Sequence, residues 1–301
     1  MILWGLAYLT DCIISQGIRK TDIREFQAWN DIYSSNIKGD VVISGNSRAW
    51  CQYNPLILDS ITGLNFYNLG IDGHPINYQI IRYNTYRRLN PKPKYIIQNI
   101  DFMTFSISHT EYEKEQFLPF IFDDTLMNEV KEDMKINWIE LKIPLIRYFG
   151  YHEIFKNGFK SFFGENKFVD GGLNKGYRGN KIAWNGAEFN KTKVIFYAKD
   201  PIALKLFASY LAKSKKEGIK VILVSAPLYF EAARKIKDLK GLNAMFIYLA
   251  RKYDLKLLDY MNDSISYDRS NFYNAMHLNK KGAELFSSKL ANDLKSLNIV
   301  N

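Results

Sequence analysis

Residues 40–48 of the chain read DVVISGNSR. A short run of β-branched residues that ends at a glycine is typical of a buried strand followed by a tight turn. We therefore expect a strand over residues 40–45 and a short helix through Trp50 that ends before Pro55. Ser47 lies in the turn between them, where a side chain is raised out of a sheet, although serine is also a common helix N-cap.

Strand and helix signals continue in alternation along most of the chain. Further strands are expected over residues 65–70 (NFYNLG), 95–101 (YIIQNID), 220–225 (KVILVS) and 255–260. Helices are expected over residues 75–89, from 201 until the glycine at 218, over 230–253, and from about 279 onward. This alternation predicts an α/β protein, a three-layer α/β/α sandwich with a five-stranded parallel, flavodoxin-like sheet that holds strand 40–45 in its interior.

The alternation stops over about residues 104–193, which are irregular, aromatic and rich in glycine. This segment includes Trp138, Tyr148, Phe155, Tyr177 and Trp184. A loop of this length without secondary structure is uncommon inside a compact domain, so we expect an inserted aromatic-rich subdomain with a few helices. The expected organisation is one domain over residues 39–301 that carries this insertion.

Residues 1–18 precede the expected domain. Residues 1–14 are mostly apolar, but Asp11 interrupts them, and the run is too short to cross a bilayer as a complete helix. Two interpretations remain open. The segment is the end of a membrane anchor that begins upstream, which we favour, or it is an amphipathic packing helix of a soluble protein.

The composition is that of a globular protein, with 47% hydrophobic and 24% charged residues. The formal net charge is +10, but no nucleic-acid-binding motif accompanies it, so nucleic acid is not an expected partner. The basic charge suits an anionic polymer, a membrane surface or simply solubility. Cys12 and Cys51 have no metal-type spacing, so we expect neither a disulfide framework nor a metal site.

Three loops at the carboxyl ends of the expected strands carry groups that could act together. Ser47 follows the first strand, residues 68–74 (NLGIDGH) follow the second, and His277 lies between the fifth strand and the last helix. Glycines let backbone N–H groups approach a ligand closely, and a histidine can act as the general base on a serine. Each residue also has an ordinary structural role, but a parallel sheet brings the three loops to one edge.

The order of these motifs resembles that of the SGNH (GDSL-like) hydrolase superfamily. The resemblance rests on Gly-Asn-Ser at 45–47 and on His-Leu-Asn-x-x-Gly-Ala at 277–283. The phrases YNLGIDG and HLNKKGAELFS are similar to bacterial cell-envelope members that partner membrane-bound O-acyltransferases in acylating surface polysaccharides. The resemblance covers about residues 39–103 and 194–297.

The resemblance implies roles for particular residues. It makes Ser47 the nucleophile and His277 the base. The implied oxyanion donors are the amide of Ser47, the amide of Gly73 with Gly70 as the alternative, and the side chain of Asn99. It implies no metal and no cofactor.

Three positions depart from the pattern of the superfamily. Asn46 replaces the aspartate of the first block, and residues 98–101 (QNID) lack the glycine of the third block. Asn274 stands where the triad aspartate is expected, three residues before the histidine. An asparagine can still orient the imidazole through its carbonyl oxygen, but it does not stabilise the imidazolium as a carboxylate does. Asp268 or Asp263 could supply the carboxylate instead.

The leading functional hypothesis is a serine-dependent esterase or O-acyltransferase that acts on acyl, in particular acetyl, esters of a cell-envelope carbohydrate. It implies an extracytoplasmic location and a membrane-bound acyltransferase as partner. Arg48 could contact an anionic substrate, with a structural role as its alternative. The competing hypothesis is a non-catalytic SGNH-like domain that binds a surface polymer or organises an export complex. A third hypothesis is a flavodoxin-like site for a nucleotide or flavin, but no Gly-x-Gly-x-x-Gly or Walker motif supports it.

Overall fold

The computed structural model of the chain describes residues 1–23, 25–107, 111–165, 175–187, 189, 194–197 and 199–300. The chain divides into two compact units. Unit 1 consists of Met1–Asn36 and Ser108–Leu173, and unit 2 consists of Ile37–Ile107 and Asn174–Asn301. Residues 104–193, which we expected to form one insertion, contribute to both units.

Unit 2 is built on a five-stranded sheet in which every strand pair is parallel. The strands are β1 (Val41–Ser44), β2 (Phe66–Asn68), β3 (Tyr95–Asn99), β4 (Lys220–Ser225) and β5 (Lys256–Asp259). Their order across the sheet is β2-β1-β3-β4-β5, so β1 lies in the interior. The predicted parallel sheet is confirmed, and several strands end a residue or two earlier than expected.

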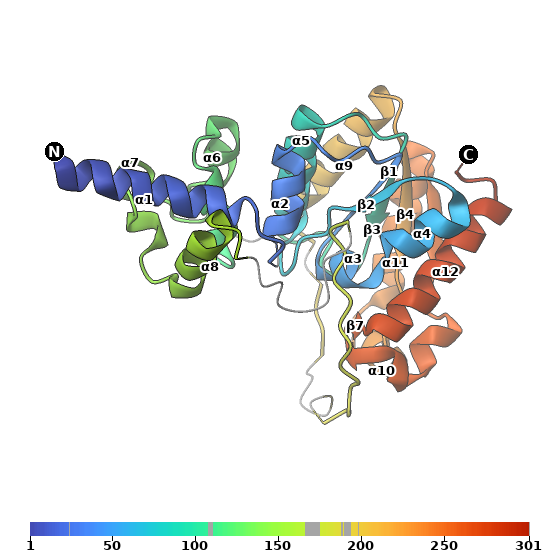
Figure 1. The fold of residues 1–301 in the computed structure, drawn as a ribbon. Coiled ribbons are helices and arrows are strands. Elements are labelled where there is room, and N and C mark those ends of the chain that lie inside the picture. Colours follow the sequence, from blue (N-terminus) through green and yellow to red (C-terminus); the bar gives the residue numbers. More distant parts are fainter. Residues whose placement is uncertain are drawn as a thin grey trace. The chain divides into compact units, whose positions relative to one another are not determined.

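Helices cover the sheet of unit 2 on both faces, and Figure 1 shows the strands between α9 and α12. The helices of this unit are α3 (Ser47–Gln52), α4 (Pro55–Thr62), α5 (Ile76–Leu89), α9 (Pro201–Lys216), α10 (Phe230–Arg234), α11 (Leu239–Tyr253) and α12 (Lys280–Ser296). α12 contacts α3 and α4, whereas α9 contacts α5 and α11. The predicted three-layer α/β/α sandwich is confirmed.

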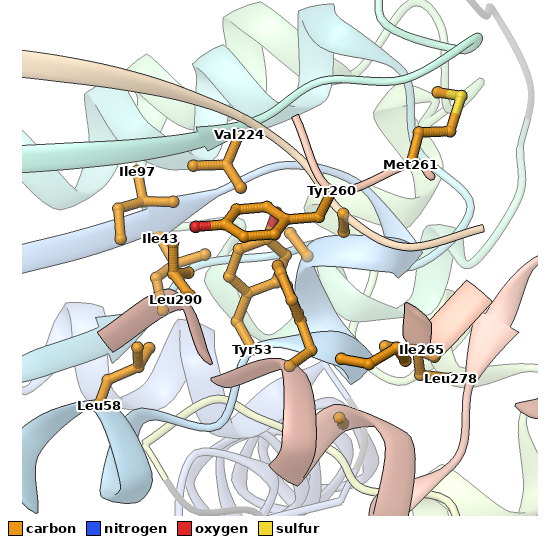
Figure 2. Close-up of a cluster of buried hydrophobic side chains, with 14 of the residues drawn as sticks. Ile43, Tyr53, Leu58, Ile97, Val224, Tyr260, Met261, Ile265, Leu278 and Leu290 are labelled. Atoms are coloured by element: carbon orange, nitrogen blue, oxygen red, sulfur yellow. The ribbon is translucent and has the colours of Figure 1, made fainter. Parts of the chain in front are cut away.

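The core on the α12 side of the sheet shows why this arrangement forms. Figure 2 shows Ile43, Ile97 and Val224, which come from three neighbouring strands, in one cluster with Leu58 and Leu290. Side chains in a strand alternate between faces, so every second residue of β1, β3 and β4 reaches this layer. Burial of each such side chain contributes about 1.5–3 kcal/mol to the free energy of folding.

The prediction of a single helix over residues 230–253 is wrong, because the helical conformation is interrupted between α10 and α11. Asp238 has a φ of +58°, a left-handed conformation that a continuous helix excludes, and its side chain accepts a hydrogen bond from the amide of Gly241. Asp238 is therefore the N-cap of α11. α4 was not predicted, although Asn54 as its N-cap and Pro55 at its first turn are ordinary start signals.

Unit 1 is helical. It contains α1 (Ile2–Ile18), α2 (Phe26–Tyr33), α6 (Asp124–Val130), α7 (Trp138–Lys142) and α8 (His152–Phe162), with short 3-10 helices at Lys114–Gln116, Leu118–Phe120 and Ile146–Tyr148. α1 and α8 cross closely at two glycines, since a Cβ atom on Gly17 would lie 1.7 Å from the carbonyl oxygen of Gly158. The carboxylate of Asp11 forms an ion pair with Arg147 and accepts a hydrogen bond from the amide of Leu145.

The two halves of α1 therefore differ. The second half is buried in unit 1 around Asp11, Ile14 and Ser15, as a packing helix would be. The first half exposes Leu3, Trp4 and Leu6, among other large apolar side chains. Of the helices in the described part of the chain, none is both long and apolar enough for a membrane crossing.

Candidate active site

Ser47 and His277 meet at the carboxyl edge of the sheet. Ser47 is the first residue of α3, directly after β1. His277 opens the two-residue strand β7 (His277–Leu278), which pairs with β6 (Phe272–Asn274) before α12 begins. The Nε2 atom of His277 lies 2.8 Å from the Oγ atom of Ser47, which is hydrogen-bond distance.

The serine hydroxyl is not used to cap its helix. Asn46 is the N-cap of α3, and its side-chain oxygen accepts a hydrogen bond from the amide of Arg48 at 3.0 Å. This removes the ordinary structural explanation for a serine at this turn. The hydroxyl of Ser47 is left to interact with the imidazole ring.

Asn274 orients the histidine from the other side. Its Oδ1 atom lies 3.0 Å from Nδ1 of His277 and accepts hydrogen bonds from the amides of Met276 and His277, both at 2.9 Å. An amide oxygen only accepts, so Nδ1 must carry the proton and Nε2 faces the serine as an acceptor. This is the tautomer that a general base requires.

The environment of His277 favours the neutral ring. Burial, and then the positive charge of Arg48, lower the pKa of His277 from 6.5 to about 3. The ring of Tyr273 stacks on the imidazole with a centroid distance of 5.3 Å and an interplanar angle of 11°. This tyrosine was not predicted as a site residue, and its place four residues before the histidine is the one signal that the sequence offers for it.

Arg48 does not have the substrate-contact role that we considered for it, because its side chain is 2% exposed. Its Nη2 atom donates hydrogen bonds to the carbonyl oxygens of Ala226 and Pro227 at 2.7 and 2.9 Å. Its Nη1 atom lies 3.9 Å from the carboxylate of Asp101. The arginine joins α3 to the loop after β4, and its charge acts on His277 from beneath the surface.

Asn46 and Asn99 are held together by Asp101. The side-chain nitrogen of Asn46 donates to both carboxylate oxygens of Asp101, at 3.0 and 3.2 Å. Asn99 is the last residue of β3; its nitrogen donates to Asp101 at 3.2 Å, and its oxygen accepts from the hydroxyl of Tyr53 at 2.8 Å. Asparagine at position 46 is thus explained, because an aspartate there would face a second carboxylate. Asn99, considered as an oxyanion donor, is already bonded within this buried network.

The two candidate oxyanion glycines have different surroundings. The amide of Gly70 donates to the side-chain oxygen of Asn68 at 2.8 Å, and a Cβ atom on Gly70 would lie 2.4 Å from the amide nitrogen of Trp50. A glycine is therefore required at position 70 because its loop packs closely against α3. Gly73 is exposed, with a φ of +64°, in the loop before α5. The amide of Ser47 is at a helix N-terminus, where N–H groups have no partner within the helix.

The alternative carboxylates are occupied elsewhere. Asp263 accepts a hydrogen bond from the amide of Ile265 and pairs with Lys289 at 3.0 Å. Asp268 accepts hydrogen bonds from the amide and hydroxyl of Ser270. The ring nitrogen that either would have contacted is bonded to Asn274. Among the described residues, no group of three or more His, Cys, Asp or Glu side chains is placed to hold a metal ion.

No family model matches the chain, and no curated protein matches it. Several solved structures are similar to it, and two of them are as follows. One is a "putative acylhydrolase" from Bacteroides fragilis, at 17% identity over 85% of this chain and 87% of that chain, with a TM-score of 0.39. The other is a "putative lipolytic protein of G-D-S-L family" from Desulfitobacterium hafniense, at 11% identity over 84% of this chain and 97% of that chain, with a TM-score of 0.42.

The fold is defined by the chain's own geometry rather than by these distant likenesses. The parallel sheet with β1 in its interior was predicted from the alternation of strands and helices, and the pairing of Ser47 with His277 is what the sequence resemblance implied. The chain therefore has a parallel α/β/α fold with Ser47 and His277 at the carboxyl edge of its sheet.

Proposed function

We propose that the protein is a serine-dependent hydrolase or transferase of acyl esters. The Oγ atom of Ser47 attacks the ester carbonyl while Nε2 of His277 takes its proton. The carbonyl oxygen becomes an oxyanion that the amides of Ser47 and Gly73 stabilise. The C–O bond to the alcohol then breaks, and His277 returns the proton to the leaving oxygen. Water, or a hydroxyl of a second substrate, releases the acyl group from Ser47 by the same steps.

The observation that carries this proposal is the pair of contacts made by one imidazole ring. Nδ1 of His277 lies 3.0 Å from Asn274, and Nε2 lies 2.8 Å from Ser47. A histidine with a purely structural role does not need an acceptor nitrogen that faces a free hydroxyl. The pKa of about 3 keeps that nitrogen unprotonated at neutral pH.

The same surroundings make the proposed enzyme slow. Proton transfer from Ser47 creates positive charge on His277, and Arg48 opposes that charge. Asn274 offers an amide oxygen where a carboxylate would stabilise the imidazolium. We therefore propose a slow or specialised enzyme rather than a general esterase.

The proposed substrate class is an acetyl ester of a cell-envelope carbohydrate, handled together with a membrane-bound acyltransferase. The motif resemblance supports this placement, and so does α1. Its side chains before Asp11 carry no charge, and Ile2, Leu3 and Trp4 are more than half exposed. A helix that is apolar on all sides is suited to a membrane or to burial. Sedimentation with phospholipid vesicles should recover the wild-type protein and lose a Leu3→Asp/Leu6→Asp variant.

Turnover of p-nitrophenyl acetate tests the proposed chemistry. Wild-type protein should hydrolyse the ester, and Ser47→Ala should lower the rate by at least about 10². Ser60→Ala, an exposed serine of α4, is the matched control and should leave the rate unchanged. If the wild type and Ser47→Ala are equally inactive while both fold, the non-catalytic polymer-binding alternative replaces this proposal.

A further inference from the structure

A segment of the chain contacts α3, which begins with Ser47, and the start of α12, which lies three residues after His277. We call residues 175–187 the strap. The amide of Arg178 in the strap donates to the carbonyl oxygen of Trp50 in α3 at 3.1 Å. Further along, the carbonyl oxygen of Asn180 accepts from the amide of Lys280, at the start of α12, at 2.6 Å. The strap is therefore attached three residues after Ser47 and three residues after His277.

The start of the strap is held rigidly, which fixes the position of Arg178. The carbonyl oxygen of Lys175 accepts a hydrogen bond from the amide of Asn68 at 2.9 Å. Gly176 has a φ of +80°, and a Cβ atom on it would lie 1.9 Å from the carbonyl oxygen of Asn68. Tyr177 is buried in the core of unit 2. An arginine that follows such a segment has a preorganised backbone, which reduces the entropy lost when its side chain binds a ligand.

The guanidinium of Arg178 lies beside residues that neighbour the catalytic pair. Its central carbon is 5.2 Å from the ring centroid of Trp50, a residue one turn after Ser47 in α3. Its charge is also near enough to Tyr273 to favour the ionised form of that hydroxyl, against the larger effect of burial, which raises the pKa of Tyr273. Because Tyr273 stacks on His277, Arg178 stands at the rim of the proposed acyl site.

This arginine is available to a ligand. Its side chain is exposed, and in the part of the chain that the structure describes no carboxylate lies within ion-pair distance of it. The charge of Asp72 also acts on Tyr273, and Asp72 has interactions of its own. An exposed guanidinium held on an indole ring keeps its forked donors free for a planar or tetrahedral anion.

The distribution of charge points to the same kind of ligand. Unit 2, which contains the site, has 30 Lys and Arg residues against 15 Asp and Glu residues. Unit 1 has 11 against 16. The net positive charge of the protein thus belongs to the unit with the proposed active site. A field of this sign raises the local concentration of anionic substrates.

We propose that Arg178 binds an anionic group of the ester substrate, so that the protein acts on acyl esters of a carboxylate- or phosphate-bearing compound. This inference rests on the proposed hydrolase function and specifies its substrate class. The anion contacts the guanidinium at the rim, while the ester carbonyl reaches Ser47. Arg178 takes the substrate-binding role that Arg48, buried against carbonyl oxygens, does not have.

A matched set of aryl acetates tests the proposal. Phenyl acetate is neutral, whereas 4-acetoxybenzoate and 4-acetoxyphenyl phosphate carry the two candidate anions. Arg178→Gln should lower the ratio of kcat/KM for an anionic ester to kcat/KM for phenyl acetate by about fivefold or more. Arg178→Lys should lose less, and Arg251→Gln, which removes an exposed charge from the last turn of α11, should keep the wild-type ratio. The anionic ester whose kcat/KM depends more strongly on Arg178 shows whether the site prefers a carboxylate or a phosphate.

An unchanged ratio in a folded Arg178→Gln variant, or an equal fall in the Arg251→Gln control, overturns the proposal. Absence of serine-dependent turnover in the wild type is a failure of the hydrolase function instead. In that case calorimetric titration with 4-hydroxybenzoate replaces the kinetics. Binding to the wild type that Arg178→Gln weakens supports the anion site, and equal binding or none overturns it.

Discussion

Replacing Asn274 with aspartate adds one negative charge beside His277 and changes little else. The Oδ1 atom of Asn274 accepts from the amides of Met276 and His277 at 2.9 Å and lies 3.0 Å from Nδ1 of His277. A carboxylate has the same shape and accepts the same three hydrogen bonds. The perturbation is therefore electrostatic rather than steric.

The expected magnitude follows from the contact with the ring. A carboxylate in hydrogen-bond contact with an imidazolium raises its pKa by about 1–3 units, which is about 1.4–4 kcal/mol. His277 is positively charged in the proposed transition states, so kcat should rise by about 10-fold to 10³-fold. Arg48 still opposes positive charge on the ring, and this places the expectation in the lower half of that range.

The assay measures kcat for p-nitrophenyl acetate between pH 5 and 9, with Asn262→Asp as the surface control and thermal melting as the check on folding. An NMR titration of His277 should show its pKa rising in Asn274→Asp. The acid limb of the rate profile should move to higher pH with it. If the pKa rises in a folded variant and kcat stays the same, His277 carries no charge in the rate-limiting step, and the reasoning is refuted.

Two further predictions concern stability. Because burial and Arg48 lower the pKa of His277 from 6.5 to about 3, the unfolded chain binds this proton at a higher pH than the folded protein does. The stability that depends on neutral His277 is present above pH 6.5, and it falls by up to about 1.4 kcal/mol per pH unit as the pH drops toward 3. The melting temperatures of wild type and His277→Gln should therefore diverge over this range. Equal slopes of melting temperature against pH would contradict the assignment. Asn46→Asp places a second carboxylate against Asp101, which raises the pKa of the new group. The variant should match the wild type below about pH 4 and lose about 1–3 kcal/mol by pH 8, so full stability at pH 8 would rule out the network described for Asp101.

Features that depend on local pattern were predictable from the sequence. The β-branched run before Gly45 produced β1, and Asp200 with Pro201 marked the start of α9. His277 could be placed before the last helix because Asn279 is a recognisable N-cap. These signals lie within a few residues of the structure that they specify.

Features that depend on distant segments were not predictable. The burial of Arg48 requires the carbonyl oxygens of Ala226 and Pro227, which follow a strand far along the chain. The position of Arg178 depends on close approaches between the strap and residues near position 68. Asp238 adopts a left-handed conformation inside a stretch whose helical periodicity continues across it, so periodicity alone joined α10 to α11.

Covalent labelling shows whether Ser47 is a nucleophile that His277 activates. A fluorophosphonate probe should add to the wild-type protein, and peptide mass spectrometry should find the adduct on Ser47. Labelling should disappear in Ser47→Ala and slow strongly in His277→Gln, while the Ser60→Ala control should label as the wild type does. An adduct on another residue, or no adduct on a folded wild-type protein, would contradict the account.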